Sequence, residues 1–330
     1  MVRTGAYAYV NYGFEATIGG SAGAITKSFG LKTAVNSLTV QTNRMALGKL
    51  GQVEPSSFAY GAQTGNLGIS FVLGDTTSHD IFQAIYGAPT GSGTSSSPYI
   101  YGSLTQGNAS KTFGAVGGVA QTFTAEIGFN GDTDYMVRTL KGCILNSLNI
   151  TTSIGETVNC SADSVFGKED APSNTSSDFS DDGVENSTPF TFAHGTLKVG
   201  GLTIAEVQDV DITFAQNGDL LYGLGSQQTA SAVKKTLEIT GRFRTSWKND
   251  DMIDKIMLQL KGTTYSETVG GSPEFELFFS NGASSPKSIK ITLSGLAIGE
   301  HSVTGLEPVE PVFEEITWQA KTCKVDAVDQ

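Results

Sequence analysis

The chain has 330 residues, including 40 Gly and 9 Pro, and only 16% of its residues are charged. This length suits two domain-sized cores, and the composition favours short strands and turns over long surface helices. The formal net charge of -12 argues against binding to nucleic acid or anionic lipid through a basic surface.

The beginning of the sequence lacks the features of an export signal. MVRTGAYAYVNYGF contains a single Arg and no continuous apolar segment. No run of the chain approaches the 18 apolar residues of a membrane span. We therefore expect a soluble chain, made in the cytoplasm, without a membrane anchor.

An alternating pattern in residues 34–43 predicts a strand with one polar face. Leu38 and Val40 alternate with the polar residues Thr39, Gln41 and Asn43. A period of two residues places the apolar side chains on one face of a sheet and the polar side chains on the other. The apolar residues of 65–73 predict a further strand of the same unit.

A short helix is predicted over residues 78–87. Ser78 and Asp80 occupy the positions of an N-cap and a first-turn acid, and Gly87 marks the end. Ile81 and Ile85 then face the core. His79 falls in the first turn, where we expect it in solvent.

Residues 88–110 predict an exposed loop inserted into the first half. The segment is rich in Gly, Ser and Thr and carries aromatic residues. Its candidate contact residues are Ser92, Tyr99 and Tyr101. Beyond it, Asn130-Gly131 predicts a tight hairpin turn, and the short apolar runs of 140–168 predict further strands.

An acidic segment, 169–190, separates a first domain, 1–168, from a second, 191–330. Its centre contains almost no large apolar side chain, which is typical of a solvated linker. A Ca²⁺ site is the alternative, although the spacing misses the EF-hand pattern; its ligands would be Asp178, Asp181, Asp182 and Glu185.

The second half predicts the same kinds of element. Residues 205–217 and 235–244 alternate as strands, with a polar face that includes Asp209, Asp211, Glu238, Thr240, Arg242 and Arg244. Residues 249–262 predict a second short helix. The basic and aromatic residues of 242–248 are interpreted as a strand end, with a phosphate or subunit contact as the alternative.

The chain contains an internal repeat. Leu140 and Gly142 recur as Leu293 and Gly295, 153 residues later, and Asn130-Gly131 recurs as Asn281-Gly282. Towards the front of each copy the offset is about 171 residues, and the insertion at 88–110 accounts for the difference. We interpret the pattern as a duplication of one β unit.

No constellation of reactive side chains predicts an enzyme. The three cysteines, without CxxC spacing, are expected to be reduced thiols: Cys143, Cys160 and Cys323. The three histidines lie far apart, outside any metal or nucleophile motif, and His301 is expected in a turn; the others are His79 and His194. We predict no catalytic residue, metal or cofactor.

Three segments carry a family resemblance: YGFEATIGG at 12–20, the strand at 31–38, and LKGCILNSLNITTSIGETVNCSADSVFGK at 140–168. They resemble the tail tube proteins of long-tailed viruses of bacteria and archaea. Asn146, Ser147 and Leu148, followed by Gly167 and Lys168, fill the positions typical of that family. The second copy departs from the pattern after Gly295.

The resemblance implies a mainly β protein of two tandem tube-like sandwich or half-barrel domains, each with one short helix. It also implies a structural virion protein, assembled in the host cytoplasm, whose rings stack into a hollow tail tube for DNA. We prefer a ring of three chains with pseudo-six-fold symmetry over a hexamer. The implied partners are tape measure and tail-terminator or tail-tip proteins.

Within such a tube, one polar strand face would line the lumen, and DNA would pass without sequence-specific contact. The candidate lumen residues are Thr39, Gln41, Asn43, Asp209, Asp211, Glu238 and Thr240. The alternative is that this face meets the outer solvent. The 88–110 loop, with Ser92, Tyr99 and Tyr101, and the termini are the candidate contacts between rings.

A second function class stays open on the sequence. A β-sandwich that binds a host surface or a carbohydrate would expose a cluster of aromatic side chains on one loop face. Tyr99 and Tyr101 are the residues that suggest it.

Overall fold

The computed structural model is mainly β, as expected. It describes residues 8–20, 22, 24–47, 57–76, 78–103, 121–130, 135–171, 187–204, 206–224, 229–246, 274–283, 285–305 and 311–330. Three expected features lie outside these ranges: the helix over 249–262, the turn after Asn130, and the candidate Ca²⁺ ligands between 178 and 185.

The strands of the first half are β1 (Ala8–Phe14), β2 (Lys27–Ser28), β3 (Leu31–Leu47), β4 (Ser57–Val72), β5 (Tyr99–Gly102), β6 (Phe123–Asn130), β7 (Tyr135–Ser153), β8 (Asn159–Phe166) and β9 (Lys168–Glu169). Those of the second half are β10 (Gly195–Val199), β11 (Leu202–Ile204), β12 (Val207–Ala215), β13 (Asp219–Tyr222), β14 (Thr229–Val233), β15 (Glu238–Ser246), β16 (Phe275–Ser280), β17 (Ser288–Ser294), β18 (Ala297–Thr304), β19 (Phe313–Ala320) and β20 (Thr322–Val328).

The first predicted helix is confirmed. A 3-10 turn, η2 (Ser78–Phe82), continues into α1 (Gln83–Tyr86), and Ile81 and Ile85 are buried. Gly87 has φ 85° and its N–H donates to the carbonyl oxygen of Gln83 at 2.8 Å. Glycine adopts this conformation without strain, so the helix ends where the sequence indicates.

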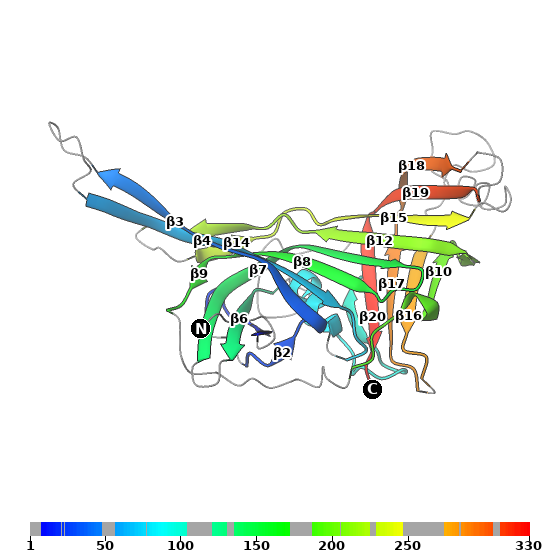
Figure 1. Cartoon of the computed structure of the whole chain (residues 1–330), viewed down its shortest axis with the longest axis horizontal. Coiled ribbons are helices and arrows are strands. Elements are labelled where there is room, and N and C mark those ends of the chain that lie inside the picture. The colour runs from blue at the N-terminus through cyan, green and yellow to red at the C-terminus, as the bar shows by residue number, and fades with distance from the viewer. Residues whose placement is uncertain are drawn as a thin grey trace.

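Eight strands from both halves form one antiparallel surface, which we call the long sheet (Figure 1). Its order is β3-β4-β8-β7-β12-β15-β19-β18. The halves meet where β7 pairs with β12. Its edge strands are β3 and β18, and within the described ranges neither pairs with a second strand.

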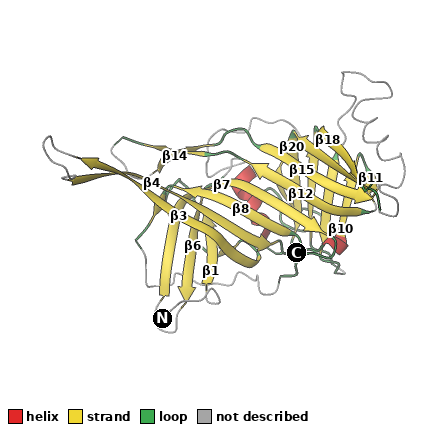
Figure 2. Ribbon diagram, turned by 45° about the horizontal axis from the view of Figure 1, so that its top comes forward, coloured by secondary structure: helices red, strands yellow, loops and turns green. Residues whose placement is uncertain are grey.

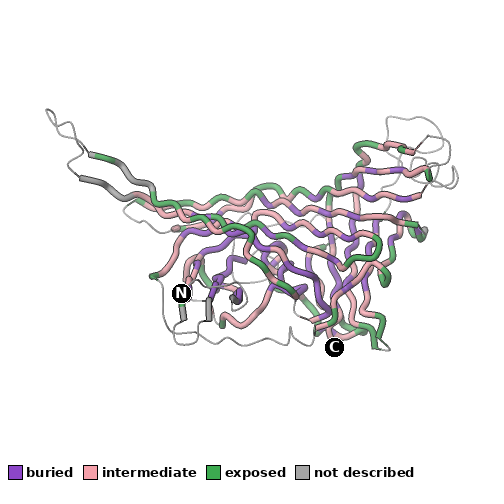
Figure 3. Tube along the Cα trace, viewed as in Figure 1, coloured by how far each residue is buried: buried purple, intermediate pink, exposed green. Residues whose placement is uncertain are grey.

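Two smaller sheets pack beneath the long sheet, and their strands cross it steeply (Figures 1 and 2). One has the order β7-β6-β1-β2, and the other β11-β10-β16-β17-β20-β5. The core lies between the layers (Figure 3), and its largest fully buried side chains include Tyr12, Phe29, Phe82, Phe123, Phe214, Phe243 and Phe275. Burying each such ring contributes about 1.5–3 kcal/mol.

The two halves have the same strand order in the long sheet. The order β3-β4-β8-β7 of the first half corresponds to β12-β15-β19-β18 of the second. Gly142, with φ 65°, bends β7 from one layer to the other, and Gly295, with φ 69°, separates β17 from β18. The repeated Leu-x-Gly pattern therefore marks a bend at which the backbone needs glycine.

Strand pairing aligns the halves residue by residue. We call a set of residues that lie opposite one another across neighbouring strands a row. A row of the first half and the matching row of the second are Leu145–Ser164–Leu67–Leu38 and Ile298–Trp318–Gly241–Ile212. The next core-facing rows are Leu148–Ala162–Ile69–Val35 and His301–Ile316–Phe243–Val210. A register shift falls after Leu145 and after Ile298, so the irregularity of the pairing recurs as well.

The bend of β7 is held by a buried carboxylate. Glu15, 3% exposed, accepts hydrogen bonds from the N–H groups of Gly142 (2.8 Å) and Gly19 (2.9 Å). It also accepts from the hydroxyls of Thr122 (2.8 Å) and Thr124 (2.7 Å). One side chain therefore satisfies four donors at the point where the two layers join.

The halves share one hydrophobic core, and one strand of the first half joins a sheet of the second. β20 of the second half pairs along β5 of the first. Glu169, at one end of the predicted linker, forms an ion pair with Arg138, and Phe190, at the other end, is buried. The ends of the acidic segment thus belong to the fold, and the division into 1–168 and 191–330 stays a prediction.

The second predicted hairpin has a wider turn than expected. Asn281-Gly282 lies between β16 and β17, but the N–H of Asn281 donates to the carbonyl oxygen of Lys287 at 3.1 Å. Gly282 has φ 70°, as the turn pattern predicts. A two-residue connection is therefore wrong, because Asn281 is hydrogen-bonded to Lys287 and not to a residue directly after Gly282.

Candidate assembly surface

Most of the predicted lumen residues lie on one face of the long sheet. This polar face is opposite the core, and it carries Thr39, Gln41, Asp209, Asp211, Glu238 and Thr240. The residues that alternate with them point inward; Val210, Ile212 and Ile239 are at most 3% exposed. Asn43 belongs to β3, but its side chain lies outside the description.

The polar face carries both signs of charge, and the two predicted arginines of 235–244 lie on it. Arg242 Nη1 lies 2.9 Å from Glu315 Oε2 and 3.4 Å from Asp209 Oδ1. Arg244 lies opposite Asp209 in β12, with its guanidinium 4.3 Å from the ring centre of Phe313. Residues 242–246 are thus a strand within the sheet, while 247 and 248 lie outside the description.

The junction of the two halves is closed on both faces of the sheet. On the polar face, Asn149 Nδ2 donates to Asp211 Oδ1 (2.8 Å) and to Thr213 Oγ1 (2.9 Å). On the core face the paired residues are at most 2% exposed: Leu148, Ile150, Ile212 and Phe214. We call this pairing of β7 with β12 the internal seam.

The predicted contact loop is exposed only in part. Ser92 is exposed and Tyr99 is half-buried, but Tyr101 is 1% exposed. Residues 99–102 form β5 and pair with β20, so an exposed loop is wrong for this part of 88–110. Tyr101 is a core residue, and the pair of exposed aromatic rings that suggested a carbohydrate- or host-binding site is absent from the described surface.

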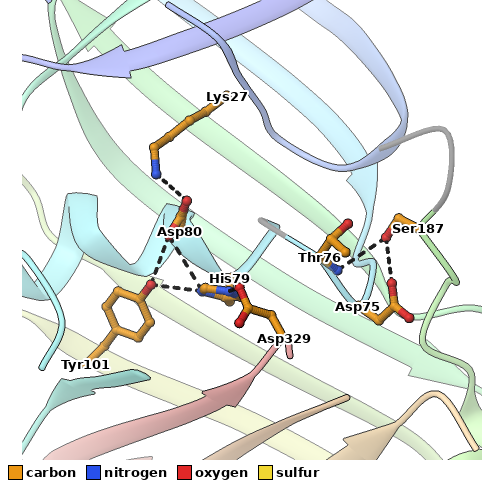
Figure 4. Close-up of polar contacts among 8 residues, drawn as sticks. All are labelled: Lys27, Asp75, Thr76, His79, Asp80, Tyr101, Ser187 and Asp329. Carbon is orange, nitrogen blue, oxygen red and sulfur yellow. Dashed lines mark hydrogen bonds and ion pairs between the residues drawn. The ribbon is translucent and has the colours of Figure 1, made fainter. Parts of the chain in front are cut away.

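The hydroxyl of Tyr101 belongs to a buried polar cluster (Figure 4). It donates to Asp80 Oδ1 at 3.1 Å and lies 2.9 Å from His79 Nδ1. His79 Nε2 lies 3.3 Å from Asp329 Oδ2, and Asp80 forms an ion pair with Lys27. Burial, together with the Asp80 carboxylate, raises the pKa of Tyr101 far above its usual range.

This cluster corrects the prediction for His79. Its ring is 5% exposed and links the helical turn to the β20 end of the second half, so a solvated role is wrong. His301 lies in β18 and not in a turn, with Nε2 3.1 Å from Glu314 Oε2. His194 is exposed in the 3-10 turn η4 (Phe192–His194). The three histidines remain at separate sites.

A second polar cluster, around Asp75, joins the two halves (Figure 4). Its carboxylate accepts from Ser187 Oγ (3.1 Å), the N–H of Thr188 (2.9 Å) and Asn281 Nδ2 (2.8 Å). The Thr76 N–H donates to Ser187 Oγ at 3.4 Å. The sequence did not point to Asp75, because its partners lie more than 100 residues away along the chain and become neighbours only in the folded structure.

Lys234 also joins the halves and is expected to make stability depend on pH. Its Nζ donates to the carbonyl oxygen of Ile85 at 2.8 Å, and burial lowers its pKa to about 8. The unfolded chain binds more protons than the folded chain between that value and the ordinary lysine pKa. The unfolding free energy should therefore rise by about 2 kcal/mol between pH 7 and pH 9.5.

Lys234→Met is the control for this pH dependence. Chemical denaturation over the same pH range should show a smaller rise in unfolding free energy for Lys234→Met than for the unchanged chain, because the variant lacks the titrating amine. Equal slopes would show that other groups cause the dependence.

The cysteines are free and buried, as expected for reduced core thiols. Burial raises the pKa of Cys143 and Cys160, and raises that of Cys323 to about 12. Because the thiolate is the reactive form, these side chains are poor nucleophiles near neutral pH.

Within the described ranges, no group of three or more His, Cys, Asp or Glu side chains is placed to hold a metal ion. No helix in this part of the chain has the length and apolar character needed to cross a membrane.

The sequence of the chain is similar to a known protein family. The family model described as phage tail tube protein matches residues 5–320. A search of curated proteins found no match. Since the family model covers nearly the whole chain and the fold is mainly β, the chain belongs to the phage tail tube protein family.

Proposed function

We propose that copies of this chain assemble into stacked rings that form a hollow tail tube, through which viral DNA passes into the host. Family membership makes the chain a structural component of the virion tail. Copies of the chain stack there and associate with other tail proteins. The observation that carries the proposal of rings and DNA passage is the long sheet, with one polar face, one apolar face and two edges that are unpaired among the described strands.

Unpaired edges favour assembly into a closed ring. An edge strand presents free N–H and C=O groups, and closure of a sheet into a barrel satisfies all of them. The edges β3 and β18 belong to different halves and lie at opposite borders of the long sheet (Figure 1). A ring closes when the β18 border of each chain meets the β3 border of the next.

Three chains per ring is the preferred arrangement. Each chain supplies two four-stranded units with the same order, so three chains would repeat the unit with pseudo-six-fold symmetry. A ring of six chains is the alternative. The diameter of a barrel grows with the number of its strands, so either ring would enclose an open lumen.

The polar face of the long sheet is the proposed lumen wall. Its carboxylate groups repel phosphate and its hydroxyl groups carry no charge. Of its two described arginines, Arg242 is paired with Asp209 and Glu315, and Arg244 lies against the ring of Phe313. Repulsion acts over a Debye length of about 8 Å at physiological salt. DNA would therefore move along this wall without a strong binding site.

Three kinds of segment are proposed to contact the neighbouring ring. The first is the exposed part of 88–110 with Ser92, next to the half-buried Tyr99 at the start of β5, and the termini form the second kind. The third is the hairpin β3–β4, which stays paired as far as Leu47 and Ser57, whereas β4 pairs with β8 only from Gly65 onward. It projects beyond the rest of the sheet (Figure 1). Tape measure and tail-terminator or tail-tip proteins are the proposed partners at the tube's axis and ends.

A charge reversal tests the lumen assignment. Virions carrying Asp209→Lys and Asp211→Lys should still contain tubes, but DNA release should slow at least tenfold, because new positive charges bind phosphate. Release should recover in part at high salt, since salt screens these contacts. Electron microscopy checks assembly, and DNA release triggered in vitro checks the rate.

The matched control is Asp209→Asn with Asp211→Asn, which removes the same two carboxylates without adding positive charge. It also removes the contact of Asp209 with Arg242. Any slowing of DNA release that the lysine variant shows and the asparagine variant does not is therefore caused by the added positive charge. Normal release from the double lysine variant in intact tubes would refute the lumen assignment of these residues.

A further inference from the structure

We infer that the contact between chains, which we call the external seam, pairs β18 of one chain with β3 of the next in the same register as the internal seam. The inference rests on the proposed ring and adds the identity and register of its contact. It follows from the matching strand orders, in which β18 corresponds to β7 and β3 corresponds to β12.

Burial distinguishes the formed seam from the open edges. At the internal seam, Ile150 and Ile212 are paired and at most 2% exposed. The rows of paired residues assign Val303 and Leu38 to the corresponding places, and both are only half-buried. A second copy would cover these apolar side chains as the chain covers its own.

The internal seam also supplies the register. Asn149 lies opposite Thr213, and Ile150 lies opposite Ile212. When each residue is replaced by its counterpart, Ser302 lies opposite Thr39 on the polar face and Val303 lies opposite Leu38 on the core face. Residues on either side follow the same register.

The two seams differ in their core-facing residues. His301 stands where the internal seam has Leu148, and Glu314, 1% exposed, stands where the first half has Cys160. Inward-pointing charged groups on an edge strand disfavour pairing with unrelated strands. The His301–Glu314 pair therefore protects the β18 edge of a free chain, while Val303 and Ser302 remain compatible with β3.

The paired residues of the polar face are close enough for a covalent test. At the internal seam, the N–H of Gln216 donates to the carbonyl oxygen of Asn146 (2.8 Å), and that of Ile154 to Gln208 (3.1 Å). Alternation from these bonded pairs makes Asn149–Thr213 a pair without hydrogen bonds, with a Cα separation of about 4.5 Å. A disulfide accepts Cα separations of about 4.4–6.8 Å.

The experiment introduces one cysteine on each edge. Thr39→Cys with Ser302→Cys is the in-register variant, and Thr39→Cys with Thr304→Cys is the control, shifted along β18 to a diagonal separation of about 7–8 Å. The native cysteines are buried and leave the background low. Tubes formed by the purified full-length chain are oxidised mildly and separated by non-reducing electrophoresis.

The expected result is a ladder of covalent species from the in-register variant that ends at three chains, and at least tenfold less cross-linking from the shifted control and from each single variant. Tubes that form normally but cross-link only in the shifted variant, or in neither, overturn the register while the tube function stands. A ladder that ends at six chains supports the seam and replaces the three-chain ring. Absence of rings and tubes from the unchanged chain by electron microscopy contradicts the proposed function itself.

Discussion

A Gly241→Leu variant is expected to lose about 3 kcal/mol of unfolding free energy. A Cβ atom on Gly241 would collide with the carbonyl oxygen of Asp211 and with the indole ring of Trp318, which is 4% exposed. Strand β15 is paired on both sides, so its backbone cannot move away. Urea denaturation followed by circular dichroism measures the loss.

The first half suggests a compensating change for this variant. At the places of Gly241 and Trp318 it has Leu67 and Ser164, so a large and a small side chain exchange positions between the halves. Trp318→Ser alone should cost about 3–5 kcal/mol through the cavity it leaves. Combined with Gly241→Leu, the total loss should fall at least 1 kcal/mol below the sum of the single losses.

A control variant and a contrary result complete this double-mutant test of Gly241 and Trp318. Gly223→Leu should change stability by less than about 0.5 kcal/mol, because a Cβ there meets only Ala230 at 3.6 Å. Strict additivity of Gly241→Leu and Trp318→Ser would show that the two places do not share volume, and would contradict the alignment of the halves.

Replacing Glu15 with alanine is expected to cost about 3–5 kcal/mol, because four donors would lose their buried acceptor. Two of these donors are backbone N–H groups, at Gly19 and Gly142, which cannot turn to another partner. The bend of β7 should therefore loosen as well. Thermal and urea denaturation give the loss, and hydrogen exchange at Gly142 reports the bend.

Two further variants separate the role of the Glu15 carboxylate from the effect of its size. Glu15→Gln keeps the volume but presents donors to donors, so its loss should be substantial and smaller than that of alanine. Glu156→Ala removes an exposed carboxylate that accepts from Ser153 Oγ at 2.7 Å, and should cost less than about 0.5 kcal/mol. A loss below 1 kcal/mol for Glu15→Ala would refute its role as an anchor.

Local patterns predicted the strands within 34–43, 65–73, 140–168, 205–217 and 235–244, the polar and apolar faces of several of them, and the first helix. Alternation around Ile212 and Phe214 identified buried residues, because a strand between two layers must turn one side inward. The Leu-x-Gly pattern is interpreted as a sign of duplication, and the structure places its glycines, Gly142 and Gly295, at positive φ where each half bends. These features depend on residues close to one another in the chain.

Features that depend on distant partners could not be predicted in the same way. Tyr101 reads as a loop aromatic residue, and it is buried because β20 and Asp80 surround it. His301 reads as a turn residue, and it lies in an edge strand with Glu314. The polar face was predicted as a set of residues, but the salt bridges of Arg242 require the order of three strands that only the folded chain reveals.

The pairing of β5 with β20 determines when the fold can be completed during synthesis. β5 emerges from the ribosome long before β20, the strand that pairs along it. The first half must therefore wait with an uncovered border, and with Tyr101 incompletely enclosed, until translation has passed through the second half. Only a fully translated polypeptide can complete both layers, so partial products lack the finished shape that neighbouring copies need.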